Sequence, residues 1–125
     1  MLYDGLKSMI EYKEFGTEEI ERVKEIYLEE GWMAYLQDDE ALRRAYANSL
    51  FCLAAYNQGK IIGFIRCVGD GEHIVIVQDF IVVPEFRGKK IGSTLFRMAW
   101  DKYSKVRMFQ VNTDIDRYAA AHSLL

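Results

Sequence analysis

The stretch from Ile74 to Tyr103 restricts the possible folds of this chain more than any other part of it. Residues 74–83 are almost continuously apolar and rich in β-branched side chains, which is typical of a strand buried on both faces. Pro84 ends that strand, because proline has no amide hydrogen to donate to a neighbouring strand. From Ile91 onward, apolar residues recur at helical spacing. The stretch predicts a central strand, a loop and an amphipathic helix in direct succession.

The loop at 84–92 combines glycines, cations and the start of a helix. Its glycines and cations are Gly88, Gly92, Arg87, Lys89 and Lys90. The first amides of a helix lack internal partners, and the helix dipole adds partial positive charge there. Glycines let the backbone approach a ligand closely. The loop therefore predicts a binding site for a phosphate or pyrophosphate group, and the alternative is a solvated basic turn that caps a core helix.

The run Val82-Val83-Pro84-Glu85-Phe86-Arg87-Gly88-Lys89-Lys90-Ile91-Gly92 resembles the signature of the GNAT family of N-acetyltransferases. The resemblance implies a GNAT-like fold and acetyl-CoA as the cofactor. It also implies that main-chain amides from Arg87 to Gly92, and on to Ser93, wrap the pyrophosphate. Lys90 departs from the family pattern, which has a glycine there. Its side chain either crowds the pyrophosphate or adds a charge to it, and a positive φ would cost a non-glycine residue about 1–2 kcal/mol.

Further site residues follow from the same resemblance. Backbone groups of Ile81, Val82 and Val83 would pair with the pantetheine arm, and Asn112 matches a family Asn near that arm. Asp79 occupies the position where many members carry a Glu that acts as the catalytic base. An acid within so apolar a run is costly unless it is paired or used.

Alternatives to Asp79 as the base remain open at this stage. Asp79 is also interpretable as an acid that bonds a bulged backbone or a neighbouring arginine. Glu72 and His73, in the turn before the strand, are the second candidates for the base. The family's general acid is commonly a Tyr expected at about Leu125 or beyond it. Tyr118 lies too early to match it.

The apolar segment between the first two helices is a candidate acceptor site. In the resembled family this segment helps to form the acceptor pocket, which makes Trp32, Met33 and Tyr35 substrate-site candidates, with Glu72 as a weaker one. Core packing is the alternative for each of the three apolar residues.

The remaining elements complete a mixed α/β domain of the α+β type over residues 1–125. A first strand is expected at 9–15, and a helix from Thr17, as N-cap, to a stop at Gly31. Asp38 caps a second helix, strands at 50–56 and 60–68 form a hairpin, and 107–112 is a parallel strand before a last helix. The expected sheet is mostly antiparallel, with helices packed on it. The family's closing C-terminal strands are lacking, so the strand at 107–112 is expected to present an apolar edge, covered by a second copy in a homodimer or by further chain.

Composition narrows the choice of partners. The formal net charge is −3, which does not favour a general nucleic-acid or membrane partner. Cys52 and Cys67 lack metal or redox spacing, so they read as small buried hydrophobes. No signal peptide or membrane span is visible, which favours a cytoplasmic location.

We therefore expect transfer of an acetyl group from acetyl-CoA to a small-molecule or peptide primary amine, by direct attack on the thioester. No metal site is expected. A non-catalytic or impaired acyl-CoA-binding module is the alternative. A binder of some other anion, such as a nucleotide, is a third hypothesis.

Overall fold

The computed structural model describes residues 9–111, and within them a five-stranded sheet has the order β1-β2-β3-β4-β5. The strands are β1 (Glu11–Glu14), β2 (Phe51–Asn57), β3 (Lys60–Gly69), β4 (Ile74–Val82) and β5 (Met108–Val111). The first four pair antiparallel, and β5 runs parallel to β4. The expectation of a mixed, mostly antiparallel sheet is confirmed.

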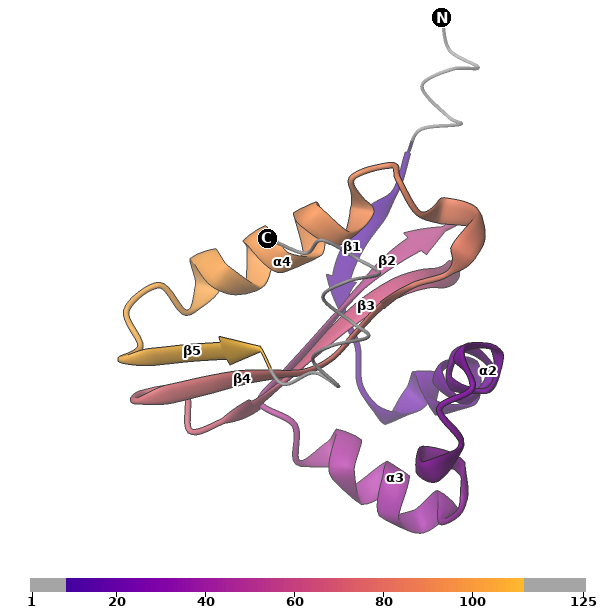
Figure 1. Cartoon of the computed structure of the whole chain (residues 1–125), viewed down its shortest axis with the longest axis horizontal. Helices are drawn as coiled ribbons and strands as arrows, with labels where there is room; N and C mark the ends of the chain where they lie inside the picture. The colour runs from indigo at the N-terminus through magenta and orange to yellow at the C-terminus, as the bar shows by residue number, and fades with distance from the viewer. Residues whose placement is uncertain (1–8, 112–125) are drawn as a thin grey trace, which may run out of the picture.

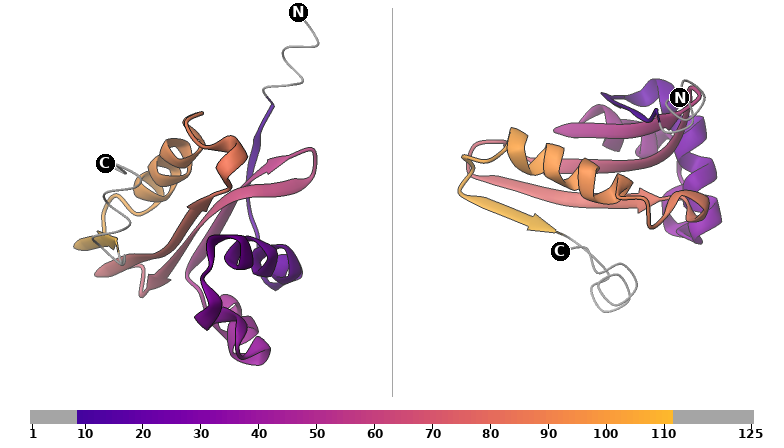
Figure 2. Two further views of the ribbon diagram at one scale, coloured as in Figure 1. Left: turned by 45° about the vertical axis from the view of Figure 1, so that its right-hand side comes forward. Right: turned by 90° about the horizontal axis from the view of Figure 1, so that it is seen from above.

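Helices cover the two faces of this sheet separately (Figures 1 and 2). One face carries α2 (Ile20–Glu30) and α3 (Asp39–Ala47), with the short 3-10 helices η1 (Thr17–Glu19) and η2 (Met33–Leu36). The other face carries α4 (Ile91–Lys102), which follows the 3-10 turn η3 (Pro84–Phe86).

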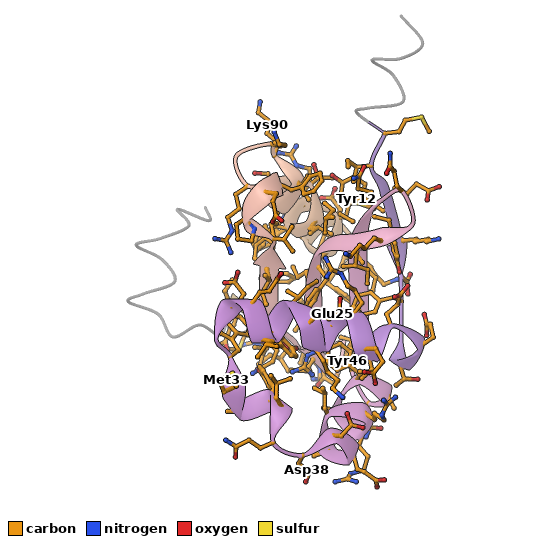
Figure 3. All side chains as sticks on the ribbon, turned by 90° about the vertical axis from the view of Figure 1, so that its right-hand side faces the viewer. Tyr12, Glu25, Met33, Asp38, Tyr46 and Lys90 are labelled. Carbon is orange, nitrogen blue, oxygen red and sulfur yellow. The ribbon has the colours of Figure 1, made fainter. Side chains whose placement is uncertain are left out.

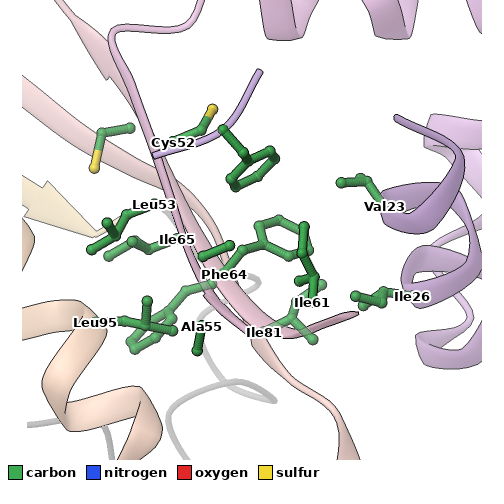
Figure 4. Close-up of a cluster of buried hydrophobic side chains, with 14 of the residues drawn as sticks. Val23, Ile26, Cys52, Leu53, Ala55, Ile61, Phe64, Ile65, Ile81 and Leu95 are labelled. Carbon is green, nitrogen blue, oxygen red and sulfur yellow. The ribbon is translucent and has the colours of Figure 1, made fainter. Parts of the chain in front are cut away.

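The core lies on both faces of the sheet. Val23 and Ile26 of α2 lie on the side toward which Phe64 points, whereas Leu95 of α4 lies on the other side of the sheet, the side of Leu53 (Figure 4). Each of these five side chains is at most 3% exposed. Amphipathic helices therefore bury their apolar stripes against a sheet that is apolar on both faces.

Local sequence signals account for two of the helix ends. Gly31 ends α2 with a left-handed φ of 78°, and the Asp38 carboxylate accepts from the Ala41 N–H at the start of α3. Both caps were expected. The assignment of Thr17 as an N-cap was wrong, because Thr17 lies inside η1 and α2 begins only at Ile20.

The β2–β3 hairpin turns at Gln58 and Gly59, both with positive φ (53° and 80°). Next to the bulge on β3, Gly63 lies close to the β4 backbone: a Cβ there would be 3.2 Å from the Ile81 carbonyl oxygen. The sequence expectation of a bulge or close backbone neighbour at Gly63 is confirmed.

The strand β4 differs from expectation in position and in burial. It lies between β3 and β5, so β3 is the central strand of the described sheet. Only one face of its first half is fully buried, since Val75 and Val77 are covered but Ile74 and Ile76 are half-buried. The register with β3 shifts around Gln78, and the ladder with β5 ends at Val77.

The β5 strand is the edge of the sheet in the described part of the chain, and its Met108 is 44% exposed. A homodimer through this edge stays a prediction. The helix expected after β5 lies outside the described residues. No helix within residues 9–111 is long and apolar enough to cross a membrane.

The two cysteines are buried and free. Burial raises the pKa of the Cys52 thiol to about 11 and that of the Cys67 thiol to about 12. Both thiols therefore stay protonated at neutral pH, as expected of small buried hydrophobes.

Candidate functional site

The loop between β4 and α4 presents a row of main-chain N–H groups. The first hydrogen bond of α4 runs from the Thr94 N–H to the Lys90 carbonyl oxygen, at 3.1 Å. The N–H groups of Ile91, Gly92 and Ser93 precede it and have no acceptor inside the helix. Within residues 9–111, the loop N–H groups from 88 to 90 have no protein acceptor either. A run of N–H groups at the start of a helix suits an anion.

Left-handed backbone at two loop residues shapes this row. Gly88 has a φ of 78° and Lys90 a φ of 69°. Where a left-handed residue adjoins right-handed backbone, as Lys90 adjoins the first residue of α4, successive N–H groups converge as in anion-binding nests. Glycine accepts this conformation readily, whereas Lys90 does not.

The lysines of the loop are exposed, and Lys90 points away from the body of the molecule (Figure 3). In the described part of the chain, neither Lys89 nor Lys90 has an ion-pair partner. Their charges are therefore available to an anion at the loop. The sequence left open whether Lys90 crowds a pyrophosphate or adds a positive charge beside it. The outward direction of its side chain favours the added charge.

The two glycines of the loop have different surroundings. A Cβ added to Gly88 would meet no atom within 4 Å. A Cβ added to Gly92 would lie 3.6 Å from Phe80 Cζ and 3.6 Å from Val82 Cγ2. A Cβ at Gly92 would thus be in ordinary van der Waals contact with β4, while the outer side of the loop at Gly88 is open.

Arg87 is already engaged with protein groups. Its Nε donates to the Val82 carbonyl oxygen at 2.7 Å, and its Nη2 donates to Glu30 Oε2 at 2.5 Å. Sequence reasoning placed Arg87 among the phosphate-binding residues and gave no reason to single out Glu30.

Only part of the main chain that was expected to hold the pantetheine arm faces the right way. The Val83 N–H donates to the Ile62 carbonyl oxygen of the β3 side, at 2.9 Å. Because N–H and C=O groups alternate in direction along a strand, the Val82 groups point to the opposite edge, and those of Ile81 point to β3. Pairing of the arm with Ile81, Val82 and Val83 stays a prediction. Of the three, Val82 lies on the edge that faces away from β3, beyond the last β4–β5 pair, and its carbonyl oxygen already accepts from Arg87 Nε.

Asp79 is the centre of a buried polar cluster on the other face of β4. It is 2% exposed, and Arg66 of β3, directly opposite in register, is 5% exposed. Arg66 Nε donates to Asp79 Oδ2 at 2.5 Å. The Tyr27 hydroxyl donates to the same oxygen at 3.0 Å, and the Tyr35 hydroxyl donates to Oδ1 at 2.8 Å. Both oxygens of the carboxylate are thus hydrogen-bonded, as in the alternative that paired Asp79 with a neighbouring arginine.

The tyrosines of this cluster are held neutral. Burial raises the pKa of the Tyr35 phenol, and the negative charge of Asp79 raises it further. The pKa values of Tyr27 and Tyr46, whose hydroxyl oxygens lie 2.5 Å apart, are also raised, mainly by burial. Burial opposes the charge of Arg66, yet the nearby Asp79 carboxylate leaves the pKa of Arg66 above its ordinary value.

Tyr35 is the member of the cluster that reaches the surface, and it lies half-buried in η2. Its ring stacks on Tyr27 at 4.6 Å, and its hydroxyl accepts from Gln78 Nε2 at 3.3 Å. Trp32 stacks on Tyr27 at 5.8 Å and is half-buried, whereas Met33 is 50% exposed. The three substrate candidates thus lie in one segment. Of the three, Tyr35 is the one that bonds Asp79.

Glu72 and His73 lie at the opposite end of β4 from the loop at 84–92. Both are exposed in the turn that precedes β4, whereas the anion loop follows β4. Nine residues of strand span about 30 Å at roughly 3.3 Å each. The role of second base for Glu72 and His73 stays a prediction. Their N–H groups donate to Asp70 Oδ1, with that of Ile74.

Two positions expected in the site, Asn112 and the general-acid position near Leu125, lie outside the described residues. No group of His, Cys, Asp and Glu within residues 9–111 is arranged to hold a metal ion.

Sequence reasoning missed Arg66, although a signal for it existed. Arg66 is the one charged residue in the apolar run from Ile61 to Val68. A buried charge in one strand and a buried acid in another are expected to pair. Tyr27 and Tyr46 carried no such signal, because a tyrosine on an apolar helix face usually reads as packing.

Residues 17–124 match the model of the acetyltransferase (GNAT) family. No curated protein gives a match to the sequence.

Three solved structures illustrate the similarity. A GNAT family acetyltransferase from Streptococcus pneumoniae is 28% identical, covers 92% of this chain and 84% of its own, and has a TM-score of 0.73. The PaiA N-acetyltransferase from Thermoplasma acidophilum, in complex with coenzyme A, is 23% identical over 78% of this chain and 73% of its own, with a TM-score of 0.63. An aminoglycoside acetyltransferase from an uncultured soil metagenomic sample, in complex with sisomicin, is 19% identical over 92% and 86%, with a TM-score of 0.64.

Proposed function

The chain belongs to the GNAT acetyltransferase family, and from that premise we propose that it transfers the acetyl group of acetyl-CoA to a primary amine. The amine nitrogen attacks the thioester directly. The single observation that carries the cofactor assignment is the row of N–H groups from Gly88 to Ser93, at the start of α4 and beside the end of β4.

The residues present fit a pyrophosphate with an extended arm. Loop and helix N–H groups lack protein acceptors within the described residues, and Gly88 leaves the outer side open. Lys89 and Lys90 supply two exposed charges, and the Val82 peptide faces the edge along which an arm would lie. Acetyl-CoA supplies the thioester whose carbonyl carbon the amine attacks.

Tyr35 is the proposed contact for the amine. Its hydroxyl gives its hydrogen to Asp79 and accepts one from Gln78. A phenol oxygen has a further lone pair, which suits an N–H donor. The hydroxyl keeps its proton at neutral pH, because the pKa of Tyr35 is raised.

Asp79 works through Tyr35 in this proposal, as the anion that orients the hydroxyl. A proton placed on Asp79 would leave the buried Arg66 without its counter-charge, and an unpaired buried charge costs about 3–5 kcal/mol. The ammonium proton is therefore lost to solvent before attack. The amine then forms the C–N bond, the C–S bond breaks, and the second amine proton leaves to solvent as the thiolate departs.

Primary amines as a class are the proposed acceptors. The similar structures include an aminoglycoside acetyltransferase in complex with sisomicin. An aminoglycoside carries amines on a polar scaffold. In this chain Trp32, Met33 and Tyr35 form the segment that we assign to the acceptor. The two half-buried aromatic rings and the exposed thioether contribute apolar contact around an amine, and an aromatic face also attracts a cation.

The test is acetylation of a panel of amines with acetyl-CoA, followed by mass spectrometry of the products. The panel contains a polyamine, an aminoglycoside, a lysine peptide and a peptide with a free amino terminus. We expect an acetylated product from at least one. Consumption of acetyl-CoA with no product from any amine would contradict the proposal.

A pair of variants tests the contact to the amine. Tyr35→Phe removes the hydroxyl that faces the acceptor, and Tyr46→Phe removes a fully buried hydroxyl of the same cluster. We expect Tyr35→Phe to raise the KM for the amine and leave the affinity for CoA unchanged. Equal effects of the two substitutions on the KM would refute the role of Tyr35.

A further inference from the structure

The loop at 84–92, called the cofactor loop below, is joined to the end of α2 by a side-chain ion pair. Arg87 and Glu30 are 57 residues apart in sequence, and their side chains form an ion pair. The same guanidinium donates to the Val82 carbonyl oxygen at 2.7 Å. Arg87 therefore joins three elements at one point: the loop, the end of β4 and the end of α2.

The position of Glu30 is unfavourable without this partner. It is the last residue of α2, where the negative end of the helix dipole opposes a carboxylate, and the last turn of α2 contains no basic residue. Its side chain is only 18% exposed, whereas that of Arg87 is 39% exposed. The guanidinium offsets both the dipole and the partial burial.

The bonds of Arg87 bear on what the loop offers a phosphate. Two of its donor nitrogens are directed at protein oxygens, whereas Lys89 and Lys90 have no ion-pair partner within residues 9–111. The direct phosphate contacts are then the main-chain N–H groups and the two lysines. Arg87 instead fixes the position of the loop relative to the end of β4, through its bond to the Val82 carbonyl oxygen.

From these contacts we infer that Glu30 is a positioning residue for cofactor binding. Glu30 holds Arg87 across the Val82 carbonyl, and Arg87 in turn holds the loop N–H groups where they converge. This inference rests on the proposed function, since it concerns the same cofactor. Because Gly31 and Trp32 follow Glu30 directly, the bridge also links the cofactor loop to the segment assigned to the acceptor.

Calorimetric titration with CoA tests the inference on the whole chain. The set comprises the parent, Glu30→Gln, Arg87→Gln and the double variant. A partly exposed ion pair contributes at most about a factor of five to an equilibrium constant. We expect Glu30→Gln to weaken CoA about two- to fivefold, and Arg87→Gln to weaken it more, because the bond to Val82 is lost as well. In the Arg87→Gln background, Glu30→Gln should have no further effect.

Glu30→Asp separates geometry from charge. It keeps the carboxylate but shortens the side chain by one methylene, so we expect the same loss as with Glu30→Gln. A match between Glu30→Asp and the parent would contradict the bridge. Asp39→Asn is the matched control. Asp39 of α3 forms an ion pair at 2.7 Å with Lys24, which lies in α2 as Glu30 does, and this pair does not involve the loop. The affinity of this variant for CoA should equal that of the parent.

Three results would overturn the inference. Tighter binding of CoA by Glu30→Gln would mean that Glu30 competes with the phosphates for Arg87. An unchanged affinity would mean that the pair has no part in binding. Equal effects of Glu30→Gln with and without Arg87 would mean that Glu30 acts independently.

Urea unfolding of the same four proteins keeps this inference distinct from the proposed function. If the parent binds no CoA, the proposed function fails, and the bridge is then judged by the coupling between the two substitutions in their effects on unfolding. A measurable coupling would support the contact itself, and additive effects would refute it.

Discussion

Replacement of Lys90 by glycine should change stability and cofactor binding in opposite directions. Lys90 has a φ of 69° immediately before α4. A non-glycine residue in this conformation costs about 1–2 kcal/mol. Glycine removes that cost, but its greater freedom in the unfolded chain returns about 0.5–1 kcal/mol. We therefore expect Lys90→Gly to raise the free energy of unfolding by about 0.5–1 kcal/mol, which corresponds to roughly 2–4 °C in Tm for a domain of this size.

The same substitution should weaken CoA. It removes an exposed charge that has no ion-pair partner among the described residues, at the loop assigned to the pyrophosphate. An exposed charge pair contributes up to about 1 kcal/mol, so the Kd should rise by no more than about fivefold. The increase should shrink at high salt, because screening reduces what the lysine contributes.

Gln58→Gly is the matched control for both measurements. Gln58 has a φ of 53° in the β2–β3 turn and is the other non-glycine residue with positive φ in the described part of the chain. It should gain similar stability in urea unfolding and leave CoA titration unchanged. Tighter CoA binding by Lys90→Gly would show that the side chain crowds the ligand. A gain in stability at Gln58 alone would refute the strain argument.

The other expectations concern the buried pair, the helix–strand contact and acid stability. Asp79→Asn should lower the free energy of unfolding by about 3–5 kcal/mol, because Arg66 is left unpaired, and Arg66→Met in addition should recover part of the loss in urea unfolding. Gly92→Ala should fold normally, whereas Gly92→Val should lose about 1–3 kcal/mol in thermal unfolding through crowding against β4; equal stability of the two would contradict the packing seen. The N–H groups that donate to Asp70 lower its pKa to about 2, below its ordinary value, so its contribution to stability is present above about pH 4 and is lost as pH falls toward 2. Asp70→Asn should flatten that part of an acid-unfolding curve, and an unchanged curve would contradict it.

The organisation around the loop was predictable because it depends on signals that lie close together in sequence. Pro84 ends β4, Gly31 ends α2, and Asp38 caps α3, each through its own backbone chemistry. The parallel placement of β5 followed from the strand–helix–strand order. Thr17 failed as a cap because its residue type favours capping without fixing where the helix begins.

The partners within the site were not predictable in this way. Arg66 meets Asp79 because the β3–β4 register, with its bulge, places the two opposite each other. Glu30 meets Arg87 only through the packing of α2 beside the end of β4. Sequence alone does not specify such registers and packing angles, so the sequence leaves open whether Asp79 is a base or the partner of an arginine, and it does not identify Arg66 or Glu30 as the partners.

The most direct test of the account is the thermal stability of the protein with CoA, acetyl-CoA, ATP or NAD at equal concentrations. A ligand that binds the folded state raises Tm by mass action. We expect CoA and acetyl-CoA each to raise Tm by more than ATP or NAD does. A rise with ATP or NAD and none with CoA or acetyl-CoA would contradict the assignment of the loop at 84–92 to an acyl-CoA.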